Sequence, residues 1–227
     1  MILRYLDIQT YIFRKKNMSF LIKLPSLKDV WLLNCVESSQ FNFFHQSFKI
    51  NNISKIIIPS LHTLSISGLL GLLSTLSLVG RVKSLHVYAP SDLKYYLDLG
   101  KKYSRTNFSY VLYLHVLKTG LIINQYGCRM YAIKSINYYE FMILHSEHHG
   151  TFNLDKATSN NIIAGPIYGK FKKGSSFLCP DGFTIDGYKL TSINKIGFQL
   201  SCLFYCFYKK RFFEMFVYNN LVLLINF

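Results

Sequence analysis

The stretch KIIIPSLHTLSISGLLGLLSTLSLVGR (residues 55–81) constrains the fold more than any other part of the chain. Its first residues, KIIIP, form a short β-branched run that predicts a strand ending at Pro59. Four leucines then recur at the i, i+3, i+4, i+7 spacing of one helix face: Leu69, Leu72, Leu73 and Leu76. The turn between strand and helix, PSLHTLS, contains one good metal ligand, His62. We therefore expect a strand, a tight polar turn and an amphipathic helix.

Strand and helix patterns continue on both sides of this stretch. Residues 20–35 predict two apolar strands around a turn near Pro25, and residues 91–104 predict a helix with Ser91 as its N-cap. Further strands are predicted at residues 84–90, 109–117, 120–133 and 138–146. This order, strand–helix–strand–helix followed by several strands, indicates a mixed α/β fold with a β-rich portion.

Residues 153–190 differ in composition from the rest of the chain, because they are polar and rich in Gly and Lys. Turn signals recur through them, including Gly165 followed by Pro166. They also carry a basic cluster: Lys170, Lys172 and Lys173. We expect a projecting segment within a single domain of residues 1–227. A solvated loop and a phosphate-contacting arm both fit the lysine cluster.

The charge of the chain favours polyanionic partners. Its 227 residues are enough for one sizeable core, and half of them are hydrophobic. Lys and Arg number 26 against 11 Asp and Glu, a formal net charge of +15 that favours nucleic acid or an anionic membrane surface. The bias toward Phe, Tyr, Ile, Asn and Lys also fits AT-rich genomes such as those of plastids. A plastid location is therefore expected, with codon drift as a source of part of the charge.

The cysteines and apolar segments favour a reduced compartment and no membrane anchor. The five cysteines are widely scattered and do not suggest a disulfide framework: Cys35, Cys128, Cys179, Cys202 and Cys206. No signal-peptide pattern opens the chain, and no apolar run reaches the length of a membrane-spanning helix. The apolar residues 196–208 predict a buried strand or helix.

Three motifs follow one another along residues 20–190. They are WLLNCVESSQ (31–40), the stretch at 55–81 with LHVYAP (85–90), and GPIYGKFKKG (165–174) followed by Asp-Gly at 181–182. Together they resemble ribonuclease Z, the tRNA 3′-end endonuclease of the metallo-β-lactamase fold. Its corresponding motifs read W-L-F-D-C-G-E-G-T-Q, I-T-H-L-H-G-D-H with G-L-x-G-L-L-S, and G-P-L-Y-G-x-L-K-x-G with D-G. The resemblance implies an α/β, metallo-β-lactamase-like αββα sandwich, incomplete at the C-terminus, with a projecting arm at 153–190.

The resemblance also implies where metal ligands would lie. In the family, histidines and an aspartate of the turn hold two metal ions, which activate water for phosphodiester cleavage. Aligned position by position, Ser60 stands at the first histidine, His62 at the second, Leu64 at the aspartate and Ser65 at the third histidine. Serine is a poor zinc ligand and leucine cannot bind metal. Three of the four ligand positions in this turn are therefore lost.

The later ligands are also incomplete. His145 matches a later family histidine, with His148 or His149 as alternatives, but no aspartate follows the strand near residue 200. His62 and His145 are thus vestigial metal ligands or an unmetallated, partly buried pair. No cofactor is expected, or zinc if a metal is retained, and no catalytic residue is assigned. The remaining histidines of strand and helix patterns are expected to pack or face solvent: His45, His86 and His115.

The motif at 31–40 carries substitutions as well. Asn34 replaces the family's aspartate, and Val36 and Ser38 replace its two glycines. Because a glycine turn uses backbone conformations that a β-branched valine disfavours, we expect this turn to be damaged.

The function implied by the resemblance is related to tRNA 3′-end processing. The family's arm clasps tRNA, which makes five residues the expected tRNA-binding set: Gly165, Pro166, Lys170, Lys172 and Lys173. The chain is interpreted as a catalytically inactive, at most RNA-binding subunit. Its partners would be tRNA or precursor tRNA and either a second copy of itself or a catalytic subunit. The alternatives are a remnant or structural protein without an RNA role and an active metal-dependent tRNA 3′ endonuclease.

Overall fold

The chain folds into two compact units in a computed structural model, Met1–Ile143 with Gln199–Phe227, and Leu144–Phe198. The structure describes residues 12–16, 19–23, 29–45, 49–125, 127–146, 150–178, 182–192, 197–204 and 220–226. The predicted arm, residues 153–190, falls inside the second unit.

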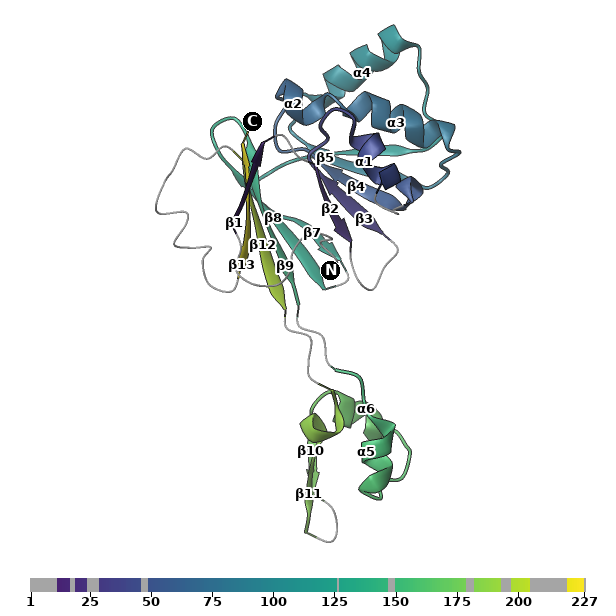
Figure 1. The fold of residues 1–227 in the computed structure, drawn as a ribbon, viewed down its shortest axis with the longest axis vertical. Helices are drawn as coiled ribbons and strands as arrows, with labels where there is room; N and C mark the ends of the chain where they lie inside the picture. Colours follow the sequence, from purple (N-terminus) through teal and green to yellow (C-terminus); the bar gives the residue numbers. More distant parts are fainter. Residues whose placement is uncertain are drawn as a thin grey trace. The chain divides into compact units, whose positions relative to one another are not determined.

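The first unit contains a five-stranded sheet of order β2-β3-β4-β5-β6 (Figure 1). Its strands are β2 (Phe20–Lys23), β3 (Val30–Leu33), β4 (Ile53–Ile57), β5 (Leu85–Ala89) and β6 (Leu112–Val116). The strand β2 is antiparallel to β3, whereas β3 to β6 run parallel. Four of these strands fall within segments predicted from the sequence, whereas β4 begins and ends two residues before the predicted strand at 55–59. Because they are parallel, the carboxyl ends of β3 to β6 meet at one edge of the sheet.

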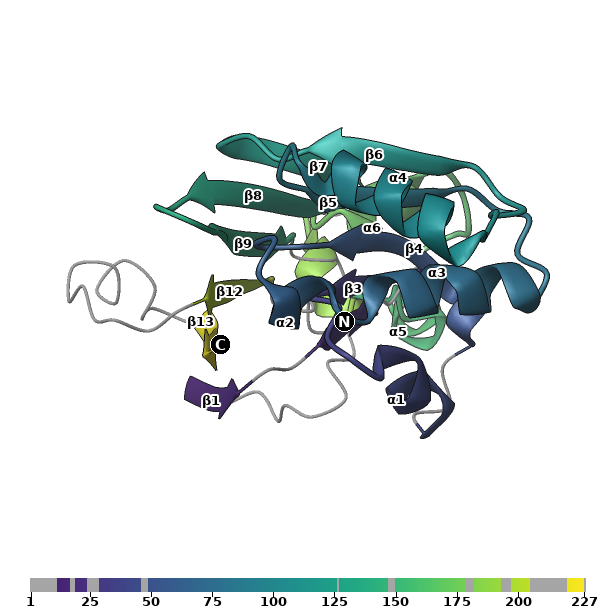
Figure 2. The same cartoon turned by 90° about the horizontal axis from the view of Figure 1, so that it is seen from above.

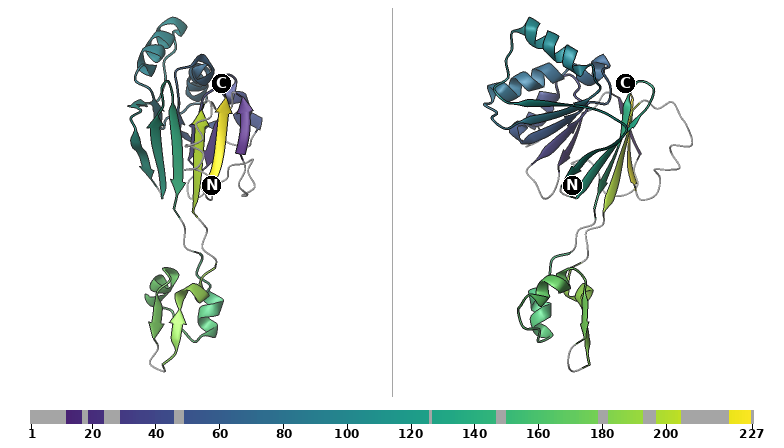
Figure 3. Two further views of the ribbon diagram at one scale, coloured as in Figure 1. Left: turned by 90° about the vertical axis from the view of Figure 1, so that its left-hand side faces the viewer. Right: turned by 180° about the vertical axis from the view of Figure 1, so that it is seen from behind.

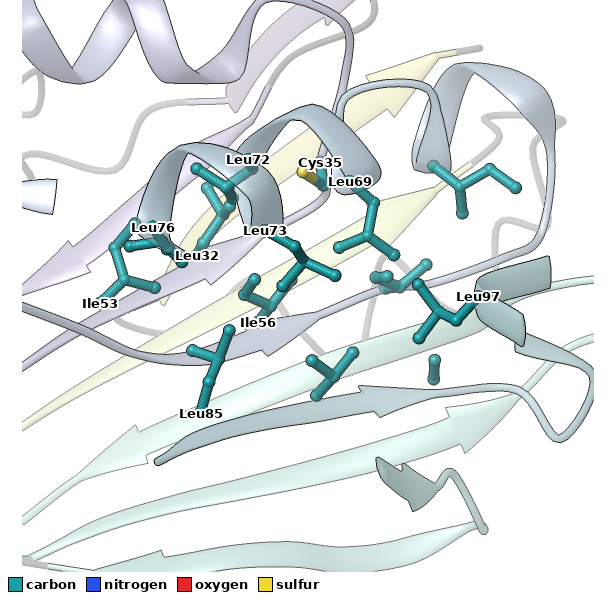
Figure 4. Packing of buried hydrophobic residues seen from close by; sticks show 14 of the residues in the cluster. Leu32, Cys35, Ile53, Ile56, Leu69, Leu72, Leu73, Leu76, Leu85 and Leu97 are labelled. Carbon is teal, nitrogen blue, oxygen red and sulfur yellow. The ribbon is translucent and has the colours of Figure 1, made fainter. Parts of the chain in front are cut away.

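Four helices cover one face of this sheet (Figure 2). They are α1 (Ser39–His45), α2 (Thr63–Ile66), α3 (Leu69–Leu78) and α4 (Leu93–Ser104), and a 3-10 turn, η1 (Ile50–Asn52), leads into β4. The predicted leucine stripe is confirmed, since its four members in α3 are fully buried against the sheet: Leu69, Leu72, Leu73 and Leu76 (Figure 4). The N-cap of α4 is Asp92, without a side-chain cap bond, so the prediction of Ser91 is wrong by one residue. The Ser91 hydroxyl donates to the Asp92 carboxylate instead.

A second, six-stranded sheet packs against the first and has the order β1-β13-β12-β9-β8-β7 (Figure 3). Its strands are β1 (Ile12–Lys16), β7 (Gly120–Gln125), β8 (Cys128–Lys134), β9 (Tyr139–His145), β12 (Phe198–Phe204) and β13 (Asn220–Asn226). The Lys55 ammonium of β4 donates to the Gln125 side chain of β7 over 2.8 Å, which joins the two sheets. Among the described residues of the first unit, no helix covers the outer face of this sheet (Figure 1).

The apolar segment at 196–208 forms a strand where the structure describes it. Its residues 198–204 are β12, which lies between β9 and β13. Leu200, Ser201 and Cys202 are fully buried there, so the prediction of a buried strand or helix is confirmed for this part. Across the described ranges, no helix is long and apolar enough to span a membrane.

The second unit has a small core of its own. Its elements are α5 (Leu154–Ser159), α6 (Ile167–Lys172), the antiparallel hairpin of β10 (Ser176–Leu178) and β11 (Thr184–Asp186), and the 3-10 turn η2 (Gly187–Leu190). Phe171 of α6 is buried and meets the Phe177 ring of β10 edge-on at 5.0 Å between centroids. Gly187 lies so close that a Cβ there would be 2.5 Å from the Phe171 carbonyl oxygen. The hairpin and the helix therefore pack into one folded module.

Candidate functional site

The turn that follows β4 is held in place at its first residue. The Pro59 carbonyl accepts a 2.8 Å hydrogen bond from the backbone N–H of Tyr139, the first residue of β9. Next to it, the hydroxyls of Ser60 and Ser65 hydrogen-bond to each other over 3.2 Å. Both serines are buried, with 5% and 0% of their surface exposed. At two positions that the resemblance assigns to metal-binding histidines, the serine hydroxyls thus satisfy each other's hydrogen-bonding needs.

His62 is exposed and acts as the N-cap of α2. Its Nδ1 accepts a hydrogen bond of 3.4 Å from the Leu64 backbone N–H. The lone pair of that nitrogen therefore points at the first turn of the helix. Leu64, at the position of the family's aspartate, has no group that could bind a metal or move a proton.

The donor groups of this turn do not fit a two-metal centre. Such a centre requires imidazole and carboxylate ligands that converge on the ions. Here the turn offers two neutral hydroxyls that bond to each other, one leucine and one exposed imidazole used as a helix cap. Within the ranges the structure describes, no three His, Cys, Asp or Glu side chains form a group that could hold a metal ion.

His145 ends β9 and belongs to the second unit, whereas His62 belongs to the first. The His145 ring is 7% exposed, and its Nδ1 donates to the Ser146 carbonyl oxygen over 2.9 Å. It also stacks on Phe198, with ring centroids 5.1 Å apart and an interplanar angle of 12°. A joint metal-binding role of His62 and His145 stays a prediction, and the alternatives His148 and His149 lie outside the described residues.

The turn after β3 is intact. Positive φ angles occur at Asn34 (65°) and Ser38 (59°), while Val36 is not among the positive-φ residues. The expectation that valine would damage the turn is therefore wrong, because its position does not need a glycine conformation. Asparagine tolerates the left-handed region, so Asn34 suits its place. The turn is bonded to the α2 segment through Cys35, whose N–H donates to the Ser65 carbonyl over 3.2 Å.

The residues expected to bind tRNA gather around α6. Gly165 precedes the helix, Pro166 is its N-cap, and Lys173 is its C-cap. Lys170, Lys172 and Lys173 are all exposed. The Lys170 ammonium lies 5.8 Å from the centre of the Phe177 ring. The three charges are thus displayed on a module whose core is fixed by Phe171. The aspartate at 181 of the third motif lies outside the described residues.

The sequence of the chain is similar to those of several known proteins. No family model matches it. The uncharacterized protein ycf56 of Pyropia yezoensis is 40% identical over 187 residues, which cover 81% of this chain and 71% of that protein. The chain belongs to the ycf56 family. The ycf56 protein of Porphyra purpurea is 36% identical over 186 residues, with the same coverage of both chains.

This ycf56-family chain is also similar to cyanobacterial ribonuclease Z. The enzyme of Trichodesmium erythraeum is 33% identical over 188 residues, covering 81% of this chain and 59% of the relative. That of Nostoc punctiforme is 31% identical over 200 residues, covering 85% and 61%. The resemblance to ribonuclease Z is confirmed, and with it the metallo-β-lactamase-like character of the α/β sandwich. The chain spans about three fifths of the length of these ribonuclease Z relatives.

Two solved structures of the same group are similar to the ycf56-family chain. The short form of human tRNase Z matches with a TM-score of 0.49 and 22% identity, over 55% of this chain and 57% of that chain. A long form of RNase Z from yeast matches with a TM-score of 0.49 and 12% identity, over 92% and 31%. Because both scores are low, the family assignment rests on the sequence relatives.

Two features of the ycf56-family chain were not found from its sequence. His86 of β5 and His115 of β6 were expected to pack or face solvent, and they hydrogen-bond through Nδ1 and Nε2 at 3.0 Å. Tyrosine rings stack on both of them, Tyr113 on His86 and Tyr88 on His115. The second feature is a pocket of about 500 Å³ beside the carboxyl ends of β5 and β6. Its walls come from segments far apart in the chain, so no local sequence signal could have revealed it.

Proposed function

We propose that this ycf56-family chain is a ribonuclease Z-like, RNA-binding protein of plastids that does not cleave phosphodiester bonds. The observation that carries the proposal is the hydrogen bond between Ser60 and Ser65. Buried hydroxyls that satisfy each other stand at two positions where a two-metal mechanism needs imidazoles. Leu64 removes the group that would move a proton in the family's reaction. Without these ligands and this proton-transfer group, we expect the chain to have no cleavage activity, rather than a reduced rate of cleavage.

The RNA-binding part of the proposal rests on the second unit. Lys170, Lys172 and Lys173 are exposed on a module with its own core, so they are available to phosphates. The formal net charge of +15 adds a general attraction to polyanions. The ligand would be tRNA or precursor tRNA, as for the ribonuclease Z relatives. A second copy of the chain or a catalytic subunit would complete any processing reaction.

The proposed plastid location is supported by the relatives. The ycf56 proteins come from Pyropia yezoensis and Porphyra purpurea, and the ribonuclease Z relatives are cyanobacterial. The AT-rich-genome character of the composition agrees with that location.

Metal content and cleavage test the first half of the proposal. Purified protein should contain far less than one zinc or manganese ion per chain by elemental analysis. Added zinc or manganese should not produce cleavage of a 3′-extended precursor tRNA. Stoichiometric metal together with cleavage at the 3′ end would establish the active endonuclease instead.

Binding across a salt series tests the second half. The variant K170A/K172A/K173A should bind tRNA more weakly than the wild type. The slope of log affinity against log salt should fall by about one for each lysine lost. The matched control K83A/K94A/K102A removes the same charge from exposed lysines of the first unit. Equal losses in both variants would contradict an arm-specific role, and no tRNA binding by the wild type would favour a remnant without an RNA role.

A further inference from the structure

A pocket of about 500 Å³ lies at the carboxyl ends of β5 and β6. Three segments line it: Pro90 and Ser91 after β5, residues 116–119 at the end of β6, and the β8–β9 hairpin from Lys134 to Tyr139. The volume falls within the range of about 300–1,000 Å³ that is usual for small-molecule sites. Open α/β sheets commonly bind ligands at the carboxyl ends of their strands.

The walls of the pocket are fixed by hydrogen bonds. The Leu117 N–H donates to the Ala89 carbonyl over 2.8 Å, which joins the segments that follow β6 and β5. The Tyr139 hydroxyl donates to the Leu117 carbonyl over 2.9 Å, which ties the hairpin to the same segment. The hairpin itself is closed by a 2.8 Å bond from the Ser135 N–H to the Tyr138 carbonyl. The three segments are therefore held together without a ligand, so little ordering is needed on binding.

The pocket adjoins the altered turn after β4. Tyr139, whose hydroxyl bonds to Leu117, also donates its backbone N–H to the Pro59 carbonyl. The lost ligand positions and the pocket thus share one edge of the sheet and one tyrosine.

The chemistry of the lining favours an anion with an organic part. Two of the lining residues, Lys118 and Lys134, are lysines, and none is Asp or Glu. Hydroxyl and amide groups come from Ser91, Thr119 and Asn137. Lysine ammonium groups bind phosphate through charge-assisted hydrogen bonds, and tyrosine rings stack on bases. A carboxylate, Asp92, lies next to Ser91 in the chain but is not among the lining residues.

We propose that this pocket binds one phosphorylated nucleotide unit, with Lys118 and Lys134 holding the phosphate. The inference goes beyond the function proposed above, because every lining residue belongs to the first unit and the arm to the second. The same chemistry could come from a free nucleotide or from one unit of an RNA strand.

Two probes distinguish these sources. Adenosine 5′-monophosphate represents the free nucleotide, and a tetrauridylate without terminal phosphates represents the RNA backbone. Binding of each to the full chain is measured by isothermal titration calorimetry at about 50 mM salt, where phosphate contacts are strong. The test variant is K118A/K134A, and both lysines are exposed, so the fold should tolerate the change.

The matched control is K49A/K83A. These exposed lysines precede β4 and β5, at the amino ends of the strands, and their loss changes the net charge by the same amount. We expect K118A/K134A to lower the affinity of at least one probe by about tenfold or more, and the control to change it by about twofold or less. Binding of the monophosphate alone identifies a free nucleotide, and binding of the tetrauridylate identifies RNA.

The proposal is overturned if neither probe binds the wild type, or if the two double variants weaken binding equally. The arm variant K170A/K172A/K173A separates this result from the function proposed above. It should keep wild-type affinity for the monophosphate or tetrauridylate while losing affinity for tRNA. If the arm variant binds the probe as weakly as K118A/K134A does, the proposal that the pocket binds the probe is also overturned.

Discussion

The hydroxyl of Ser60, in the turn after β4, and that of Ser65, in α2, form a buried hydrogen bond of 3.2 Å. In the ribonuclease Z resemblance, both positions belong to metal-binding histidines. The substitutions are therefore complementary, because each serine supplies the partner that the other would lack in a buried environment. The hydroxyls at these two buried positions thus satisfy each other without a metal ion. The strand and helix on either side can remain packed without any ion.

The serine pair should behave as a coupled unit in stability measurements. Ser60→Ala or Ser65→Ala leaves one buried hydroxyl without its partner, and each should lower the free energy of unfolding by about 1–3 kcal/mol. The double variant removes both groups, so its cost should be clearly less than the sum of the single costs. Urea denaturation of the four proteins measures the coupling energy. Additive single effects would show that the hydrogen bond does not hold the turn.

Helices and strands could be predicted where apolar residues repeat at regular spacing over a short stretch of sequence. The leucine stripe of α3 and the β-branched run of β4 identified a helix and a strand, since both patterns repeat over a few residues. The position of the α4 cap was wrong by one residue, because Ser91 and Asp92 are both good cap types and only backbone angles distinguish them. Val36 was misjudged because the family's glycine pattern does not reveal which position takes a positive φ.

For the candidate site, the sequence predicted only which metal-ligand positions are replaced. Aligned motifs revealed that Ser60 and Ser65 replace ligands, but not that their hydroxyls meet. The pocket depends on Ser91, Lys118 and Tyr139, which are brought together by three separate strand ends. Contacts between residues so far apart in sequence depend on the order of strands in the sheet. Local sequence patterns do not determine that order.

Acid should destabilise the protein through His86. Burial, followed by the neighbouring His115, Lys55 and Arg81, lowers the pKa of His86 below its ordinary value of 6.5. The unfolded chain therefore binds a proton that the folded chain does not, and stability is lost as the pH falls below about 6.5. His86→Phe removes this group, so its unfolding free energy should fall less between pH 7.5 and 5.5 than that of the wild type.

The control for this prediction is Tyr113→Phe. It changes a ring stacked on His86 at 5.0 Å but leaves the imidazole pair in place. Its pH dependence should match that of the wild type in chemical denaturation at both pH values. An equally steep loss of stability in His86→Phe would show that other groups cause the acid sensitivity.

The buried thiols should be inert in the native protein. Burial raises the pKa of Cys35 to about 12 and that of Cys128 to about 11, and it also raises the pKa of Cys202. Since the thiolate is the reactive form, all three should resist thiol reagents at neutral pH. The variant C179S/C206S leaves only these three cysteines. Ellman's reagent should detect none of them until denaturant is added, and fast labelling of the native variant would contradict their burial.

Two glycines near the altered turn should respond to alanine in opposite directions. A Cβ at Gly68 would lie 2.0 Å from the Val36 carbonyl oxygen, where the junction of α2 and α3 approaches the turn after β3. Gly68 also donates its N–H to the Cys35 carbonyl over 3.2 Å, so the two segments cannot separate without losing that bond. Gly68→Ala should therefore lower the free energy of unfolding by about 1–3 kcal/mol or more.

Gly71, three residues further along, is the matched control. It lies at an exposed position of α3, and a Cβ there would meet only the Gln40 side chain, at 3.4 Å. Gly71→Ala should raise stability by roughly 0.5–1 kcal/mol, because alanine favours a helix over glycine by about that amount. Urea denaturation of both variants measures the difference. If Gly68→Ala is as stable as Gly71→Ala, the close approach between the α2–α3 junction and the turn after β3 does not exist in solution.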